Sequence, residues 1–424
     1  MNLFFLLSVI IFVGTLLLVI LRPKNIGIGY SALIGAAISF IFGIINFQDI
    51  VTVWDIIWNA TFTFVAIIII SLILDEAGVF EFAAIKVAKF SGGNGKVLLI
   101  LVILLGAGIS AVFANDGTAL ILTPIIYLLL RRANVEQKRI IPFIMATGFI
   151  ADSSSLPLII SNLVNIITAG YFGISFMEYA FKMLLPDVVS ILASVVFLYL
   201  FYRKEIPGFF DMSKMRDEHT VIRDPFIFRI SLPMIIILLL AYSLGGYFSL
   251  PVSIIAVPAS VLLLLIARIN RKVDLAKPLK EAPWQIVLFS LGMYLVVFGM
   301  GREGMTQILS GVLNSMNTLY PPLRVLFSGY LFAAIAGIMN NLPSIMLGNL
   351  ALSSVHGPLN LVYANVVGND IGPKFTPIGS LATLVWIHTL NRKSGIRIST
   401  GYYMKVGFII GFPVLTLTLL SLSI

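Results

Sequence analysis

Two short polar clusters interrupt hydrophobic segments in the two halves of the chain. One cluster is Asn115-Asp116-Gly117-Thr118, and the other is Asn340-Asn341-Leu342-Pro343-Ser344. Amide and hydroxyl groups donate and accept hydrogen bonds, and an aspartate at membrane depth is a candidate proton carrier. Polar, helix-breaking tips inside apolar hairpins are typical of secondary transporters, in which the broken segments meet near the bilayer midplane.

Two further polar clusters contain the residues that break helices. The first runs from Ala151 to Pro157 and holds Asp152, Ser153 and Ser154; the second runs from Gly368 to Ser380 and holds Asp370, Lys374, Thr376 and Ser380. Proline and glycine unwind these helices and free backbone amides and carbonyls, which then offer hydrogen-bonding groups to a bound substrate. The sequence therefore predicts a polar pocket with few fixed cations.

Three carboxylates are predicted at membrane depth: Asp116, Asp152 and Asp370. An ionised residue there costs several kcal/mol unless it is paired or hydrated. Proton carriage is one interpretation, and capping of a half-helix N-terminus is the other, which suits Asp152 before its three serines. Lys374 follows Asp370 by four residues, so we expect it either to neutralise Asp370 on one helix face or to contact the substrate.

The composition defines a polytopic membrane protein. Hydrophobic residues make up 59% of the 424 residues and charged residues 11%, whereas a soluble domain carries roughly 25% charged residues. The length allows about ten spans of roughly 20 residues. The chain has no cysteine and a net charge of +9, and the basic residues fall in loops, which indicates cytoplasmic loops of a cell-membrane protein and not nucleic-acid binding.

Several functional classes are excluded. The segment Gly92-Gly93-Asn94-Gly95-Lys96 resembles a phosphate loop, but Phe90 occupies the first glycine position and Val97 the hydroxyl position. We therefore expect no ATPase in this chain. Without cysteine there is no thiolate metal site or catalytic thiol, and the three histidines fall in loops or near span ends. We predict no cofactor, no metal site and no enzyme activity.

Charge and segment length predict two inverted repeats. Segment 97–130 lies between basic clusters and is too short for two crossings, so it should form a re-entrant hairpin that turns at Asn115-Asp116-Gly117. Segment 325–354 should form the second hairpin, entering from outside. The repeats are 1–201, with the broken helix 140–168, and 228–424, with the broken helix 360–390; they are joined by a cytoplasmic linker, 202–227. Three pairs of identical residues support this division, because the two members of each pair are separated by the same number of positions. The pairs are Asn115 and Asn341, Trp58 and Trp284, and Gly78 and Gly304.

These motifs resemble those of the bacterial arsenite/antimonite efflux permeases, the ArsB family of the ion transporter superfamily. The resemblance covers essentially the whole chain. The motifs on which the resemblance rests are Phe113 to Pro124, Gly148 to Leu158, Ser161 to Asn165, Met339 to Pro343, Tyr363 to Lys374 and Thr376 to Thr383. It implies a fold of inverted repeats with hairpins and broken helices, and export of trivalent arsenite or antimonite in exchange for protons. Some relatives also associate with a separate cytosolic ATPase, and the resemblance leaves that partner open.

The resemblance also indicates which residues form the site. As primary substrate-binding or proton-coupling candidates it selects Asn115, Asp116, Asp152, Asn340, Asn341 and Asp370, with Ser153, Ser154, Thr376, Ser380 and Lys374 as secondary candidates. Arsenous acid is neutral and presents three hydroxyls, which suits a pocket of amides, hydroxyls and backbone dipoles. A sodium-coupled carboxylate or anion transporter of the same superfamily, a sodium/proton antiporter and a channel remain alternatives. Ser161-Asn162-Leu163 stands where such carboxylate transporters have Ser-Asn-Thr, and the second half has no Ser-Asn-Thr.

Overall fold

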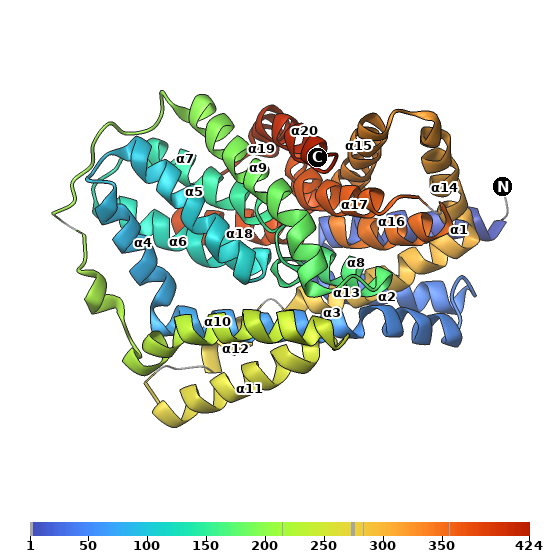
Figure 1. The fold of residues 1–424 in the computed structure, drawn as a ribbon, viewed down its shortest axis with the longest axis horizontal. Helices are drawn as coiled ribbons and strands as arrows, with labels where there is room; N and C mark the ends of the chain where they lie inside the picture. The colour runs from blue at the N-terminus through green and yellow to red at the C-terminus, as the bar shows by residue number, and fades with distance from the viewer. Residues whose placement is uncertain (1–2, 214, 273–275, 283, 356) are drawn as a thin grey trace.

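The computed structural model is entirely helical in its regular elements (Figure 1). It describes residues 3–213, 215–272, 276–282, 284–355 and 357–424, and their side chains except at 116, 277, 278, 281, 388, 389 and 392–394. The helices of the first half are α1 (Leu3–Leu21), α2 (Ile28–Ile41), α3 (Phe47–Ala77), α4 (Val79–Phe90), α5 (Gly95–Val112), α6 (Asn115–Arg132), α7 (Gln137–Ser153), α8 (Leu163–Phe172) and α9 (Phe176–Tyr202). Those of the second half are α10 (Pro225–Tyr247), α11 (Val252–Asn270), α12 (Ala276–Glu281), α13 (Trp284–Met300), α14 (Thr306–Ser315), α15 (Pro321–Met339), α16 (Asn341–Val355), α17 (Leu359–Ile371), α18 (Leu381–Ser394), α19 (Thr400–Val406) and α20 (Phe412–Ser421).

Nine helices within the described residues are long and apolar enough to cross a membrane. Their outward faces carry large apolar side chains: Leu232, Ile237 and Leu244 on α10 are each 64% exposed. Such a surface avoids water only when lipid covers it. The count is close to the ten spans predicted from length, and the 14-residue α2 is too short to be included.

The helices pack in two layers. In the view of Figure 1, α2, α3, α10, α11 and α13 form the lower layer, while α5 to α7 and α15 to α20 lie above them. Contacts of α8 with α3 and of α16 with α13 join the layers. The polar clusters of the sequence therefore lie on the upper layer and on the surface that it presents to the lower one.

The two helix pairs turn within one or two residues. Phe113 and Ala114, both extended, connect α5 to α6, so the turn precedes the predicted Asn115-Asp116-Gly117, which instead opens α6. Asn340 alone connects α15 to α16 and has φ 82° and ψ 148°. This backbone conformation is strained for any residue with a side chain. It is held because the Asn340 side chain accepts from Leu342 N at 3.2 Å and donates to Ile378 O at 3.1 Å.

Two helices are interrupted where the sequence places proline and glycine. Residues 154–162 separate α7 from α8, and residues 372–380 separate α17 from α18. Pro157, Pro373 and Pro377 lie within these two segments and cannot donate the hydrogen bonds that would continue a helix. We call residues 154–162 the first break and residues 372–380 the second break.

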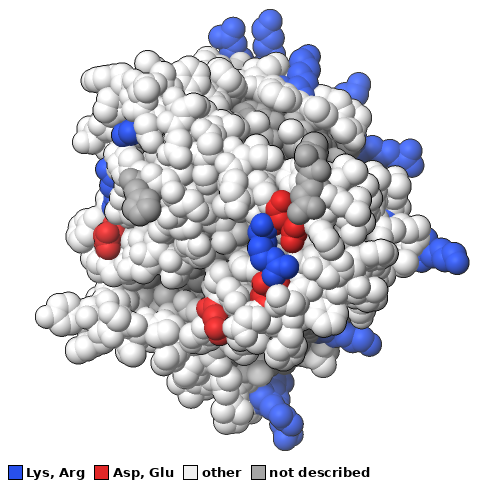
Figure 2. Space-filling model, turned by 90° about the vertical axis from the view of Figure 1, so that its right-hand side faces the viewer, with Lys and Arg blue, Asp and Glu red and all other residues white. Residues whose placement is uncertain are grey.

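The segment between α9 and α10 packs against helix ends of the first half. Gly95 N donates to Gly208 O at 3.3 Å, Lys89 pairs with Glu218, and Arg223 Nη2 lies 3.2 Å from Glu81 Oε2. The Lys89–Glu218 pair shifts the pKa of both side chains: the Glu218 carboxylate raises the pKa of Lys89, and Lys89 lowers the pKa of Glu218. These contacts place the end of α4 and the start of α5 on the same side of the molecule as this basic segment. Figure 2 views the end of the molecule away from it, where most of the surface is uncharged. Basic side chains project at the rim, and a small group of basic and acidic side chains lies nearer the centre of this face.

Candidate functional site

The first polar group links the end of α7 to the second break through an ion pair. Lys374 Nζ lies 2.6 Å from Asp152 Oδ2, and both side chains are 3% exposed. Asn115 Nδ2 donates to Asp152 Oδ1 at 2.7 Å, and Lys374 also donates to Gly148 O at 2.6 Å. Three predicted residues from α6, the end of α7 and the second break therefore share one buried carboxylate.

The partners of Lys374 and Asp152 differ from two sequence expectations. The ion pair expected between Lys374 and Asp370 does not form, because residues 372–375 make a 3₁₀ turn and the four-residue helical spacing is lost. Asp152 does not cap a helix N-terminus, because it lies in the last turn of α7. Asn162 takes the capping role instead: its side chain accepts from Val164 N at the start of α8.

The second polar group links the first break to the end of α17. Asn162 Nδ2 donates to Asp370 Oδ1 at 2.7 Å and lies 3.1 Å from Ser155 Oγ. Asp370 is fully buried, and its Oδ2 has no hydrogen-bond partner within the described part of the chain. The last turn of the helix before each break thus carries one aspartate, which is bound by a side chain of the other break.

The remaining predicted residues divide into three sets. Asn340 and Thr376 tie the end of α15 to the second break, since Thr376 Oγ1 donates to Gly337 O at 2.5 Å. Ser153 and Ser154 donate to the carbonyls of Phe149 and Ile150 in α7. Asn341 and Ser380 are buried at the starts of α16 and α18. The side chain of Asp116, at the start of α6, lies outside the described residues.

Sequence reasoning missed a chain of buried amides and one carboxylate. Thr168, Asn349, Asn365 and Asn369 hydrogen-bond in succession from α8 through α16 to α17, with separations of 2.8–3.2 Å. Asp187 on α9 is 4% exposed. The signal for Asp187 was present in the sequence, because it is an ionisable residue inside the apolar segment 177–201.

Several buried polar atoms near the breaks have no hydrogen-bond partner among the side chains that the structure describes. Ser344 Oγ, Asn369 Oδ1 and Asn165 Oδ1 join Asp370 Oδ2 in this respect. Buried polar groups are normally satisfied, so such atoms mark where a water molecule or a ligand belongs. These atoms are three acceptor oxygens and one hydroxyl.

Two cavities of similar size lie outside these polar groups. One, of about 660 Å³, is lined by α3, by Ile166 and Ala169 of α8, and by the connection between α10 and α11. The other, of about 590 Å³, lies among Glu136, Arg139 and residues 397–402. The larger cavity therefore reaches the helix that follows the first break.

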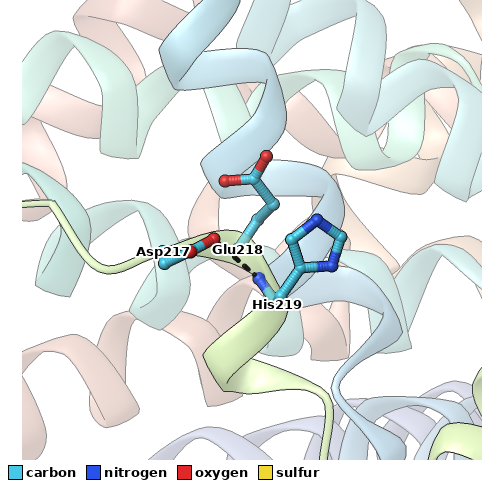
Figure 3. Close-up of side chains that lie close together, drawn as sticks. All are labelled: Asp217, Glu218 and His219. Atoms are coloured by element: carbon cyan, nitrogen blue, oxygen red, sulfur yellow. Dashed lines mark hydrogen bonds between the residues drawn. The ribbon is translucent and has the colours of Figure 1, made fainter.

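One cluster of possible metal ligands occurs among the described residues, at Asp217, Glu218 and His219 (Figure 3). Its groups already have structural partners. Asp217 Oδ1 accepts from His219 N at 3.1 Å, and Glu218 pairs with Lys89. Asp217 and His219 are exposed, and the cluster lies in the segment between α9 and α10, away from the two breaks.

The all-helical fold, its nine candidate spans and the buried polar groups at two broken helices define a multi-pass membrane transporter. The structure is similar to that of the Alcanivorax borkumensis YdaH transporter, with a TM-score of 0.55 at 13% identity, over 87% of this chain and 85% of that one. This likeness shows a related fold.

The sequence matches the ArsB family, described as arsenical pump membrane protein, over residues 7–424. It is 46% identical over 425 residues to the arsenical pump membrane protein of Escherichia coli K12, covering 99% of this chain and 98% of that protein. It is 45% identical over 418 residues to that of Yersinia enterocolitica, covering 98% and 97%. The chain belongs to the ArsB family. The resemblance predicted from the motifs and the multi-pass membrane location are confirmed.

Proposed function

We propose that this protein exports trivalent arsenite or antimonite, as the neutral hydroxide, from the cytoplasm in exchange for protons by alternating access. The observation that carries the proposal is the pair of buried aspartates bound across the two breaks. Asp152 is bound by Lys374 and Asn115, and Asp370 by Asn162. A carboxylate at that depth that gains or loses a proton changes the charge of the site, which biases one of the two access states.

The proposed architecture is two inverted repeats, 1–201 and 228–424, with 202–227 as a cytoplasmic linker. Its support is the matching order of elements: α5 and α6 form a hairpin before the first broken helix, and α15 and α16 form one before the second. With the basic segment in the cytoplasm, the first hairpin enters from inside and the second from outside. The half-helix N-termini of α6, α8, α16 and α18 then direct backbone amides to the middle of the membrane.

The substrate assignment rests on chemistry and on relatives. The relatives named above are arsenical pump membrane proteins. A neutral trihydroxide needs hydrogen-bond donors and acceptors but no fixed charge, and the unpartnered oxygens of Asn369, Asn165 and Asp370 supply acceptors. The chain has no cysteine, so no soft thiolate retains trivalent arsenic when it must be released. The coupling ion is the proton, and a separate cytosolic ATPase is an additional partner to be tested.

The test is arsenite uptake into everted membrane vesicles with an acidic interior and no ATP. We expect uptake that collapses with a protonophore and does not respond to sodium. Repeating the assay with a cytosolic arsenite-stimulated ATPase and ATP tests the additional partner. Uptake that requires sodium, or transport of a carboxylate in right-side-out vesicles driven by sodium, would replace the proposal with the sodium-coupled class.

A further inference from the structure

A chain of buried side-chain amides connects α17 to α8 by way of α16. Asn369 Nδ2 donates to Asn365 Oδ1 at 2.8 Å, and Asn365 Nδ2 donates to Asn349 Oδ1 at 3.0 Å. Asn349 Nδ2 donates in turn to Thr168 Oγ1 at 3.2 Å, and all four side chains are fully buried. In Figure 1, α16 and α17 lie side by side and α8 lies next to them. The nitrogen donors of this chain all face α8, so the chain ends on α17 in a carbonyl oxygen.

The backbone of α17 sets this direction. Asn369 Nδ2 lies 2.8 Å from the backbone carbonyl oxygen of Asn365 as well as 2.8 Å from its Oδ1. A backbone carbonyl only accepts, so the amide nitrogen of Asn369 must face Asn365, and both of its hydrogens are used. Asn369 Oδ1 therefore faces away from the chain, where it is buried without a hydrogen-bond partner in the part of the chain that the structure describes. Whatever satisfies this oxygen must donate a hydrogen bond.

The middle of the amide chain is packed tightly against α16. A Cβ added at Gly348 would lie 2.4 Å from Asn365 Oδ1, so the Asn365 side chain lies directly on the α16 backbone. Asn365 presents its Oδ1 to Asn369 and must therefore present its Nδ2 to Asn349. Asn365 and Asn349 thus hold the amide of Asn369 in one orientation.

The amide chain is also part of a closed ring. Asn162 at the start of α8 donates to Asp370 at the end of α17, so the two helices are joined a second time without α16. Between Asn162 and Thr168, α8 carries Asn165, whose Oδ1 is buried and, like Asn369 Oδ1, has no partner among the described residues. Both atoms are amide carbonyl oxygens, which accept and cannot donate. A ligand of this ring must therefore supply the donors.

We propose that Asn369 contacts the substrate by accepting a hydrogen bond from one of its hydroxyls, and that Asn365 and Asn349 are positioning residues that hold Asn369 Oδ1 in place. The site therefore selects a neutral molecule with several hydroxyl donors and rejects an anion that offers acceptors alone, because buried acceptors without a donor are costly. This inference rests on the proposed function, because it takes the trihydroxide as the substrate, and it adds three amides to the sequence-predicted site.

The test measures exchange of labelled for unlabelled arsenite in everted vesicles without a gradient, over a range of arsenite concentrations. We expect N369A to raise the half-saturating concentration about three- to tenfold, as for one lost hydrogen bond. The rate at saturation should stay within about twofold of wild type. N365A should raise the half-saturating concentration by a similar factor. The double variant N365A/N369A should raise it no further than N369A alone, because both changes act on the same acceptor.

S310A is the matched control. Ser310 is buried on α14 and donates to Ala351 O of α16 at 3.1 Å, so its loss removes a buried hydrogen bond to the same helix outside the ring. S310A should bind arsenite as wild type does. A rise in S310A equal to that in N369A would overturn the proposal, because any lost hydrogen bond to α16 would then have the same effect.

Two further results would contradict the roles of the amides. A wild-type half-saturating concentration in N369A would overturn the substrate contact. A double variant whose effect is the product of the two single effects would overturn the positioning role, because independent structural losses combine in that way.

If N369A does not assemble, competition against arsenite exchange in the wild-type protein replaces it. Antimonite should inhibit, whereas succinate, which carries no hydrogen-bond donor at neutral pH, should not inhibit even in large excess. Inhibition by succinate would overturn the selection for donors. Failure of wild-type vesicles to show saturable arsenite exchange would instead overturn the proposed function.

Discussion

At the residue scale, the site is organised by which charge neutralises which. Lys374 is in the second break but binds Asp152, at the end of α7, and not its sequence neighbour Asp370. Removing one partner of a buried ion pair leaves an uncompensated charge, which typically costs about 3–5 kcal/mol. The pair therefore stabilises the junction between the two halves mainly because neither member can be buried alone.

We predict that K374Q lowers the thermal stability of the purified transporter strongly, and that the double variant D152N/K374Q recovers part of the loss because it removes the orphaned carboxylate. The measurement is the thermal midpoint in detergent. K89Q, which removes the exposed Lys89–Glu218 pair, is the control and should leave the midpoint unchanged. With D152N measured as well, a loss in the double variant equal to the sum of the K374Q and D152N losses would show that the two side chains are not energetically coupled.

At the element scale, the breaks are held by close backbone contacts. A Cβ added at Gly407, between α19 and α20, would lie 1.8 Å from Lys374 O, the carbonyl of the residue that binds Asp152. Backbone cannot yield as a flexible side chain does. The close contact at Gly407 therefore holds the second break in place, and with it the ion pair between Lys374 and Asp152.

We predict that G407A displaces the second break and lowers arsenite transport at least several-fold, together with the thermal midpoint. Gly401, in α19, is the matched control because a Cβ there meets nothing within 4 Å. Alanine is the better helix former, so G401A should be neutral or slightly stabilising. Wild-type transport by G407A would mean that the contact relaxes freely and does not position Lys374.

Whether the sequence predicts a feature of these elements depends on how far apart in the sequence the interacting residues lie. The breaks were predictable because Pro157, Pro373 and Pro377 act on their own helix. The partner of Lys374 could not be predicted from the sequence, because the pairing depends on how two helices that are far apart in the sequence pack. The turn of the first hairpin was misplaced by two residues, because Asn115 is compatible with both a turn and a helix start. Asp187 was missed because its apolar helix contains no other sign of a site.

At the scale of the whole molecule, orientation in the membrane decides whether the two hairpins enter from opposite sides. The basic segment between α9 and α10 gathers the ends of α3, α4 and α5 on one side. The connection between α10 and α11, which includes Ser249, lines the larger cavity at the other end of α10. If basic loops stay in the cytoplasm, that cavity opens outward.

The absence of cysteine makes this orientation directly measurable, because any thiol label must sit on the introduced residue. Ser213 and Ser249 are both exposed. We predict that a membrane-impermeant maleimide labels S249C in intact cells but not S213C, and that everted vesicles give the reverse. Labelling of both variants from one side would contradict the orientation of α10, which alone separates the two positions. The two hairpins would then no longer enter the membrane from opposite sides, and inverted repeats could no longer explain how the two breaks meet.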